Sequence, residues 1–321
     1  MSLTAPLVPA AQALASAASE WIIPYASGPS ADAWANLQLP HLQALLAQLT
    51  PHTAVDGSEF DFSPPHERML ARAMQLPDTP GLIPWAALAV KETEQACAFI
   101  TPCHWHIGAD HVHQGDPMTT PLTEDESHQL LALLAPWFKD DGITLEYLQP
   151  NLWLARGAAF DNLATASMDR ALNRDVRPWL PNAKQAAVIQ RLQSEVQMLL
   201  YTHVFNDHRA ALGQVPINAF WVHGSGRLIS APAAAQQAVC ISDLYAPALQ
   251  GDVAGWHKAM QTLDSTLFAT LQQRIAKGEK IKLTLCGERH AVQWQSTERG
   301  FMDKIKSLFA SKRLPDMQNM L

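Results

Sequence analysis

Long helix-forming stretches alternate with short apolar runs along the last two thirds of the chain, and this alternation limits the fold more than any other feature. Residues 183–204 are the clearest predicted helix, because Ile189, Leu192, Val196 and Leu199 fall on one stripe. Strands that alternate with such helices favour a layered α/β fold. The predicted strands cover residues 97–102, 143–149, 151–157, 217–224, 238–243, 280–287 and 290–295, and further helices cover 127–138, 255–278 and about 299–310.

The first 95 residues have a different texture. Leucines at helical spacing predict a helix at 41–49, and a second helix is predicted at 65–76. Residues 50–65 between them are polar and rich in turn-forming residues, which predicts a loop. We therefore expect a mainly helical N-terminal region, 1–95, and an α/β body, 96–321, although one compact domain of residues 1–321 fits the same pattern.

Composition excludes several classes of protein. The net charge of −7 over 321 residues disfavours nucleic-acid binding, which needs a basic surface. No stretch is long and apolar enough to predict a membrane span. The four cysteines form no C-x-x-C pair, and the first basic residue is Arg68, so no secretory signal is expected. These features favour a cytoplasmic protein.

Four histidines, a cysteine and an aspartate lie within residues 103–115. His104 and His106 are two positions apart, as are His111 and His113, so each pair shares one face of an extended segment. Neutral imidazole is a common ligand of zinc and similar ions. The stretch predicts either a divalent-metal site, with Zn²⁺ or Mn²⁺ as the ion, or the rim of a ligand pocket, or a structural turn.

A second informative stretch covers residues 206–226. Arg209 can hold a phosphate or carboxylate in a forked pair, and a Gly-Ser-Gly turn at 224–226 can offer backbone N–H groups to an anion. A dinucleotide site is not expected, because Ile229 stands where a third glycine is needed. The candidate residues for a small phosphorylated or anionic ligand are Asn206, Asp207, Arg209, Asn218, Gly224, Ser225 and Gly226.

Five motifs, in order, carry a family resemblance over most of the chain. The motifs are PPHERMLA (64–71), TPCHWHIGADHV (101–112), LATASMDR (163–170) with RPWLP (177–181), RLQSEVQMLLYTH (191–203) and ND-x-R-x-x-x-G-x-x-P-x-N-x-F-W-x-x-G-x-G (206–226). With these motifs the chain resembles the bacterial RpfE-type regulatory proteins, whose members are also described as phosphoglycerate mutases. The stretch 206–226 is similar to the closing segment of archaeal-type cofactor-independent phosphoglycerate mutases, so the resemblance implies an alkaline-phosphatase-like core.

The chain departs from the mutases at its beginning. They open with a strand that runs into an Asp-Gly metal motif and use a Ser or Thr nucleophile. The early candidate here is VDGSEFD (55–61), with Ser58 as nucleophile and Asp56 or Asp61 as ligands, and no strand is predicted before it. The resemblance therefore implies a degenerate core.

Within the family pattern, Trp105, Asp110 and His111 shape a pocket or turn. His104 also belongs to that pattern, whereas His106 and His113 are additions of this chain.

Three functions remain open from the sequence. The first is a cytoplasmic regulatory protein without its own phosphoryl-transfer chemistry, which binds a small phosphorylated or anionic ligand or a protein partner. The second is a metal-dependent phosphoglycerate mutase-like phosphotransferase or hydrolase. The third is a protein–protein interaction module that uses the acidic N-terminal region, because residues 1–67 contain no lysine or arginine.

Overall fold

The computed structural model describes residues 7–14, 18–182, 184–230, 238–296 and 320–321, and the chain forms two compact units. Unit 1 comprises Met1–Leu76 and Pro232–Leu321, and unit 2 comprises Pro77–Ala231. Each unit has its own buried apolar core. The division lies at residues 76 and 231 rather than near 95, because the two ends of the chain build the same sheet.

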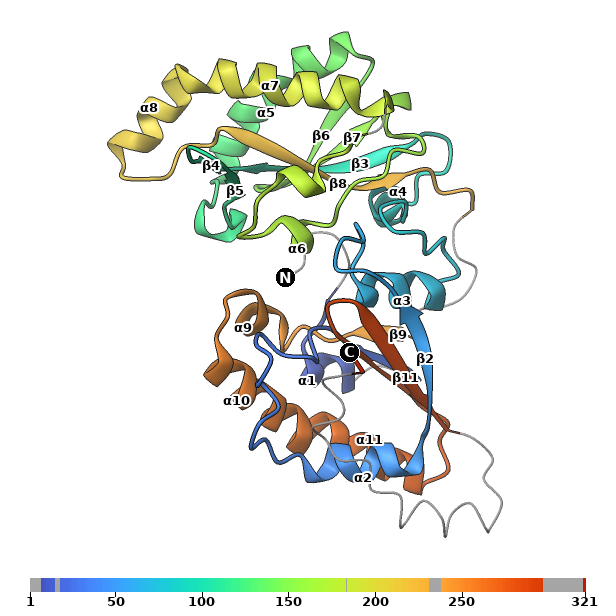
Figure 1. Cartoon of the computed structure of the whole chain (residues 1–321). Coiled ribbons are helices and arrows are strands. Elements are labelled where there is room, and N and C mark those ends of the chain that lie inside the picture. Colours follow the sequence, from blue (N-terminus) through green and yellow to red (C-terminus); the bar gives the residue numbers. More distant parts are fainter. Residues whose placement is uncertain (1–6, 15–17, 183, 231–237, 297–319) are drawn as a thin grey trace. The chain divides into compact units, whose positions relative to one another are not determined.

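Unit 1 contains a five-stranded sheet with the order β2-β11-β10-β1-β9 (Figure 1). β1 runs parallel to both β9 and β10, whereas β11 is antiparallel to β10 and to β2. The strands are β1 (Glu20–Ile23), β2 (Thr50–Asp56), β9 (Ala238–Cys240), β10 (Lys282–Cys286) and β11 (His290–Gln295).

Helices cover both faces of this sheet. Trp21, Leu283 and Trp294 point to the face that packs on Leu42 and Trp256 in one apolar cluster. The opposite face is covered by α3 (Figure 1). The helices of unit 1 are α1 (Ala10–Leu14), α2 (Pro40–Gln48), α3 (Pro65–Ala73), α9 (Tyr245–Leu249), α10 (Val253–Leu263), the π-helix Asp264–Phe268 and α11 (Ala269–Ala276).

Two strands of unit 1 were not expected from the sequence. The predicted loop 50–65 begins with β2, which is the edge strand of the sheet and therefore tolerates Pro51. β1 is only four residues long and buried on both faces, so it lacks the alternation that reveals a strand. The N-terminal region therefore contributes strands as well as helices.

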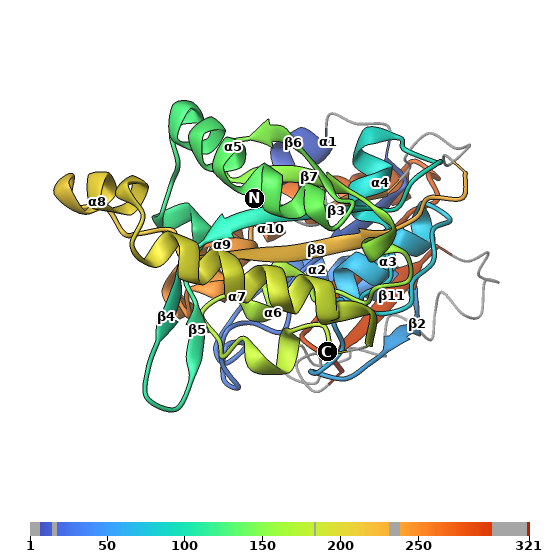
Figure 2. The ribbon, with the colours of Figure 1, turned by 90° about the horizontal axis from the view of Figure 1, so that it is seen from above.

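Unit 2 contains a four-stranded antiparallel sheet with the order β6-β7-β3-β8, and a separate hairpin of β4 and β5. The helices α5 and α7 pack together against one face of the sheet, around Phe138, Trp153 and Phe220 (Figures 1 and 2). The strands are β3 (Cys97–Cys103), β4 (Trp105–Ile107), β5 (Val112–Gln114), β6 (Thr144–Gln149), β7 (Leu152–Arg156) and β8 (Ala219–Gly226).

The predicted layered α/β fold with flanking helices is confirmed, as are most of the predicted elements of unit 2. Thr123 caps α5 in a capping box with Glu126, as its sequence indicates. The predicted helix at about 299–310 lies outside the described residues. The helices of unit 2 are α4 (Trp85–Val90), α5 (Glu124–Asp140), α6 (Met168–Ala171), α7 (Ala187–Tyr201) and α8 (Val204–Ala211), with short 3₁₀ turns at Pro117–Thr119, Ala158–Phe160, Arg177–Trp179 and Lys184–Ala186.

Within the described residues, no helix combines the length and the apolar character that a transmembrane helix requires.

The N-terminus of α2 is capped by Asp264, a residue that is distant in the sequence but belongs to the same unit. Leu39 precedes α2 and provides no side-chain cap. Instead, the buried carboxylate of Asp264 accepts hydrogen bonds from the backbone N–H groups of Leu42 (2.7 Å) and His41 (3.3 Å). The carboxylate satisfies two helix N–H groups and complements the positive end of the helix dipole.

We expect Asp264→Ala to lower the free energy of unfolding of unit 1 by about 2 kcal/mol, because this helix end loses its only side-chain acceptor among the contacts described here. Asp264→Asn keeps an acceptor oxygen and should lose less. Urea denaturation followed by circular dichroism measures both changes. Equal midpoints for Asp264→Ala and the wild type would contradict this role.

Candidate functional site

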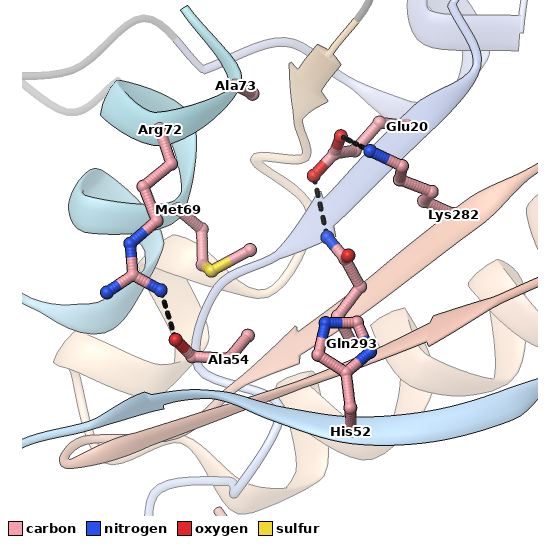
Figure 3. Close-up of a pocket in the computed structure, with 8 residues that line it drawn as sticks. All are labelled: Glu20, His52, Ala54, Met69, Arg72, Ala73, Lys282 and Gln293. Carbon is pink, nitrogen blue, oxygen red and sulfur yellow. Dashed lines mark hydrogen bonds and ion pairs between the residues drawn. The ribbon is translucent and has the colours of Figure 1, made fainter. Parts of the chain in front are cut away.

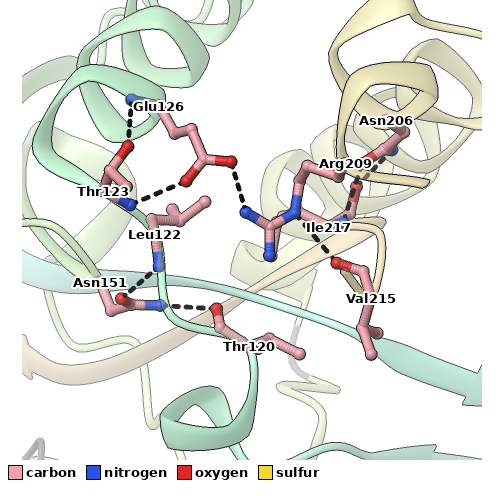
Figure 4. A network of polar contacts seen from close by, with 9 residues as sticks. All are labelled: Thr120, Leu122, Thr123, Glu126, Asn151, Asn206, Arg209, Val215 and Ile217. Carbon is pink, nitrogen blue, oxygen red and sulfur yellow. Dashed lines mark hydrogen bonds and ion pairs between the residues drawn. The ribbon is translucent and has the colours of Figure 1, made fainter. Parts of the chain in front are cut away.

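The expected anion-binding arginine is buried and already paired. Arg209 is 1% exposed on α8. Its Nη1 donates to Glu126 Oε1 at 2.7 Å, and its Nε donates to the carbonyl of Val215 at 3.0 Å (Figure 4). The guanidinium therefore ties α8, the segment before β8 and the start of α5 together, and does not face an open binding site.

The two asparagines of the same stretch are also structural. Asn206 donates to the carbonyl of Ile217 and accepts from its N–H (Figure 4). It also donates to the carbonyl of Leu200. Asn218 accepts from the N–H of Trp105 at 2.7 Å and donates to its carbonyl at 2.9 Å. Asparagine suits both positions because its amide offers a donor and an acceptor side by side. Asp207, by contrast, is exposed in the first turn of α8.

The expected Gly-Ser-Gly turn is the end of strand β8. Gly226 pairs with Cys97 of β3, and the hydroxyl of Ser225 is buried against Thr165 and the carbonyl of Leu163. Gly224 has φ +61°, and a Cβ atom there would meet the Cβ of Trp85 at 3.0 Å. Glycine is needed here for backbone conformation and close packing rather than for an anion.

The early candidate for a nucleophile is part of a local loop. Asp61 accepts from the N–H of Ser58 and pairs with Arg68, and the Ser58 hydroxyl accepts from the N–H of Phe60. Asp56 pairs with His290 across two neighbouring strands at 3.0 Å. These contacts hold the β2–α3 connection and do not gather Ser58, Asp56 and Asp61 around one point.

The four histidines of residues 103–115 lie on one face of the β4–β5 hairpin. We call His104, His106, His111 and His113 the histidine face. The ring centroids of His104 and His106 are 4.4 Å apart, and those of His111 and His113 are 4.5 Å apart. His106 pairs directly opposite His113 in the hairpin. The stretch is therefore a hairpin rather than a simple turn, and the alternation of its side chains produces two pairs of neighbouring imidazoles.

Trp105 and the hairpin tip have separate roles. Trp105 is buried, and its indole N–H donates to Gln114 at 2.9 Å, which fixes the base of the hairpin. Asp110 and His111 are exposed at the tip, where the N–H of Gly108 donates to the carbonyl of His111. Trp105, Asp110 and His111 therefore do not line one common pocket.

A pocket of about 280 Å³ lies in unit 1, between α3 and the sheet (Figure 3). Its floor carries Glu20 of β1, which accepts from Gln293 at 2.8 Å and pairs with Lys282 at 3.4 Å. Gln293 also donates to Thr284 at 3.1 Å. The full lining is Glu20, His52, Ala54, Met69, Arg72, Ala73, Lys282 and Gln293.

The polar face of this pocket follows from strand register. Lys282 is paired with Glu20 and Thr284 with Gln293, so their side chains gather on the face opposite the tryptophan-rich core. Sequence reasoning missed the pocket. The alternation of Lys282 and Thr284 with leucines was a usable signal, but the partners on β1 and β11 cannot be assigned without the topology.

Buried polar residues also mark the opposite end of β1. Tyr25 lies two residues after β1, with φ +55°, and its ring centroid lies 5.5 Å from that of His66 and 5.7 Å from that of Tyr245. His66 and Glu67 occupy the first turn of α3 and are each 1% exposed. In open α/β sheets, ligands often bind beyond the carboxyl ends of parallel strands, which is where these side chains lie.

No family model matches the chain, and no curated protein matches it. Among solved structures, it is similar to a cofactor-independent phosphoglycerate mutase from Thermoplasma acidophilum, with 12% identity, 95% of this chain and 98% of that chain covered, and a TM-score of 0.38. It is also similar to the PH0037 protein from Pyrococcus horikoshii, with 11% identity, 94% and 97% covered, and a TM-score of 0.42.

We expect Arg209→Ala to lower the free energy of unfolding of unit 2 by about 3 kcal/mol, because it leaves the Glu126 carboxylate and the Val215 carbonyl without this partner. Arg191→Ala is the matched control. Arg191 is half exposed and pairs with Glu195 and Asp141 at the surface, so its loss should cost about 1 kcal/mol or less. Chemical denaturation of both variants measures the difference.

The effect of Arg209→Ala should also depend on pH. Burial raises the pKa of Glu126, but the Thr123 N–H and the Arg209 guanidinium outweigh it, so the pKa is lowered. The stabilisation is complete above the unfolded pKa, about 4.3, and is lost as the pH falls through the lower folded pKa. The difference in free energy of unfolding between the wild type and Arg209→Ala should therefore become smaller in acid. A difference that stays constant from neutral pH to the acid transition would contradict a stabilising ion pair between Arg209 and Glu126.

Proposed function

We propose that this chain is a cytoplasmic regulatory protein that binds a small anionic ligand, phosphorylated or carboxylated, on an α/β scaffold of the alkaline-phosphatase type. The pocket between α3 and the sheet of unit 1 is the ligand site. In this proposal the core is degenerate and residues 206–226 perform no phosphoryl transfer. The resemblance to RpfE-type regulatory proteins supports the regulatory role.

The observation that carries the proposal is the charge arrangement of the pocket. Arg72 and Lys282 bring two cationic side chains to its lining, against the single carboxylate of Glu20. His52 and Gln293 add hydrogen-bonding groups, and Met69 adds an apolar contact. A pocket of about 280 Å³ with a few polar groups suits a small metabolite.

Lys282 is the residue best placed to exchange partners. Its side chain is half exposed, whereas its partner Glu20, 3.4 Å away, is buried. The ammonium can therefore turn to an anionic ligand while it remains in contact with water. Glu20 keeps its hydrogen bond from Gln293 when this happens, because that bond is independent of Lys282.

We expect Lys282→Ala to weaken the binding of 3-phosphoglycerate, used as a probe with a phosphate and a carboxylate, by about tenfold. This is the loss of one charge-assisted hydrogen bond. Isothermal titration calorimetry measures the affinity. Lys277→Ala, which removes an exposed lysine just after α11, is the control and should leave binding unchanged.

Two results would contradict the ligand site. One is equal affinity of the wild type and Lys282→Ala for the probe. The other is an absence of binding to the wild type by any phosphorylated or carboxylated probe of this size.

The buried residues at the carboxyl end of β1 support a second candidate function, a metal-dependent phosphoglycerate mutase-like phosphotransferase or hydrolase. His66 and Glu67 offer an imidazole and a carboxylate, which suit Zn²⁺ or Mn²⁺. Tyr25, next to His66, adds a hydroxyl-bearing side chain to the same end of the sheet. This set replaces the ligands expected from residues 55–61.

Phosphate release from a phosphomonoester, with added Mn²⁺ or Zn²⁺, separates the two functions. Under the regulatory function the wild type gives no metal-stimulated turnover. Under the second function turnover is present and is lost in Glu67→Gln, which preserves side-chain shape but removes the charge. Turnover that persists in Glu67→Gln would contradict the second function as assigned here.

A further inference from the structure

The histidine face has a geometry that its structural contacts do not require. His106 is exposed and His113 is half buried, and the two lie opposite each other in the hairpin. His104 directly precedes β4 and His106 lies within it, and their rings meet edge to face with centroids 4.4 Å apart. Directly paired positions place their Cβ atoms about 5 Å apart, so three imidazoles start from neighbouring positions on one surface.

The base of this hairpin is held by hydrogen bonds from two other segments of unit 2. Asn218 clamps the backbone of Trp105 with two hydrogen bonds. Gln114 accepts from the Trp105 indole, and its backbone exchanges hydrogen bonds with Asn173 and Arg174. The backbone under His104, His106 and His113 is therefore ordered before any ligand arrives, which lowers the entropic cost of binding.

His104 is prepared for coordination by its hydrogen bond. Its Nδ1 lies 2.8 Å from the carbonyl of Pro216, and a carbonyl only accepts, so Nδ1 carries the proton. In the neutral ring, Nε2 is then the unprotonated nitrogen that a metal requires. A second-nitrogen contact with a backbone carbonyl is the usual support of metal-binding histidines.

We propose that the histidine face binds one divalent ion of the type that prefers imidazole, Zn²⁺ above all, through His104 and His106, with His113 as a third ligand. Zinc–nitrogen bonds of about 2.1 Å in a tetrahedron place two ring centroids about 5 Å apart, close to the spacing of His104 and His106. In the part of the chain that the structure describes, the histidines do not bring three ring nitrogens within 4.8 Å of one another. His106 and His113 therefore turn towards the ion as it binds.

This site shares no residue with the ligand pocket and does not include Glu67, so it stands or falls independently of the proposed function. Imidazole suits Zn²⁺, Cu²⁺ and Ni²⁺, whereas Mn²⁺ prefers carboxylate oxygen. The three-histidine set therefore selects Zn²⁺ over Mn²⁺ and leaves coordination positions for water.

The test is Zn²⁺ affinity of the untagged full chain, measured by competition with a chromophoric chelator. We expect His106→Ala to weaken the strongest site by about tenfold or more, because one metal–nitrogen bond is lost. His104→Ala should have a similar effect and His113→Ala a smaller one. His106 is exposed, so its variant tests the site without disturbing the hairpin base, and circular dichroism confirms that each variant is folded.

His128→Ala is the matched control. His128 is also surface-exposed and also lies in unit 2, but on α5, and its loss should leave Zn²⁺ affinity unchanged. The inference is overturned if the wild type binds Zn²⁺ no more tightly than the double variant that carries both His104→Ala and His106→Ala.

Discussion

The parallel pairing of β1 with β9 and β10 is the constraint on which unit 1 depends. β1 has four residues, and all of them are buried. Its neighbours begin more than two hundred positions later in the chain, so the sheet closes only when both ends of the polypeptide meet. The same pairing sets Glu20 beside Lys282 and brings Gln293 within reach, so it creates the polar floor of the pocket.

Unit 2 shows how a stretch that resembles a ligand-binding motif can serve the fold. Arg209, Asn206 and Asn218 are residue types expected in an anion-binding site. Each of them instead forms hydrogen bonds with backbone carbonyls, backbone N–H groups or Glu126. Buried polar groups need such partners, since leaving one unpaired costs more than a single hydrogen bond contributes. The stretch 206–226 is thus explained by the corner it builds between α7, α8 and β8.

Local periodicity predicted the parts of the fold whose signal is local. The stripe of Ile189, Leu192 and Val196 marks α7, and the helix predicted at 127–138 lies within α5. β1 and β2 were not predicted. β1 is too short and too buried to show alternation, and β2 is an edge strand that contains a proline. The division into two units was not predicted either, because the pairing of distant strands leaves no trace in local composition.

The candidate sites were predictable only in part. Alternation places each histidine pair on one face if the segment is extended, but the pairing of His106 with His113 depends on a hairpin that the sequence did not predict. The roles of Arg209 and Asn218 depend on partners 83 and 113 positions away, and the pocket joins β1, β2, β10, β11 and α3. Such long-range juxtapositions are properties of the topology and not of any single motif.

The central claim is that an anionic ligand contacts the unit 1 pocket and not the guanidinium of Arg209. Side-chain NMR resonances during a titration with 3-phosphoglycerate test it most directly. The account predicts that the Gln293 amide and the Lys282 ammonium signals shift with one common saturation curve while the Arg209 Nε–H signal stays in place. A saturable shift at Arg209, with Gln293 and Lys282 unmoved, would contradict it.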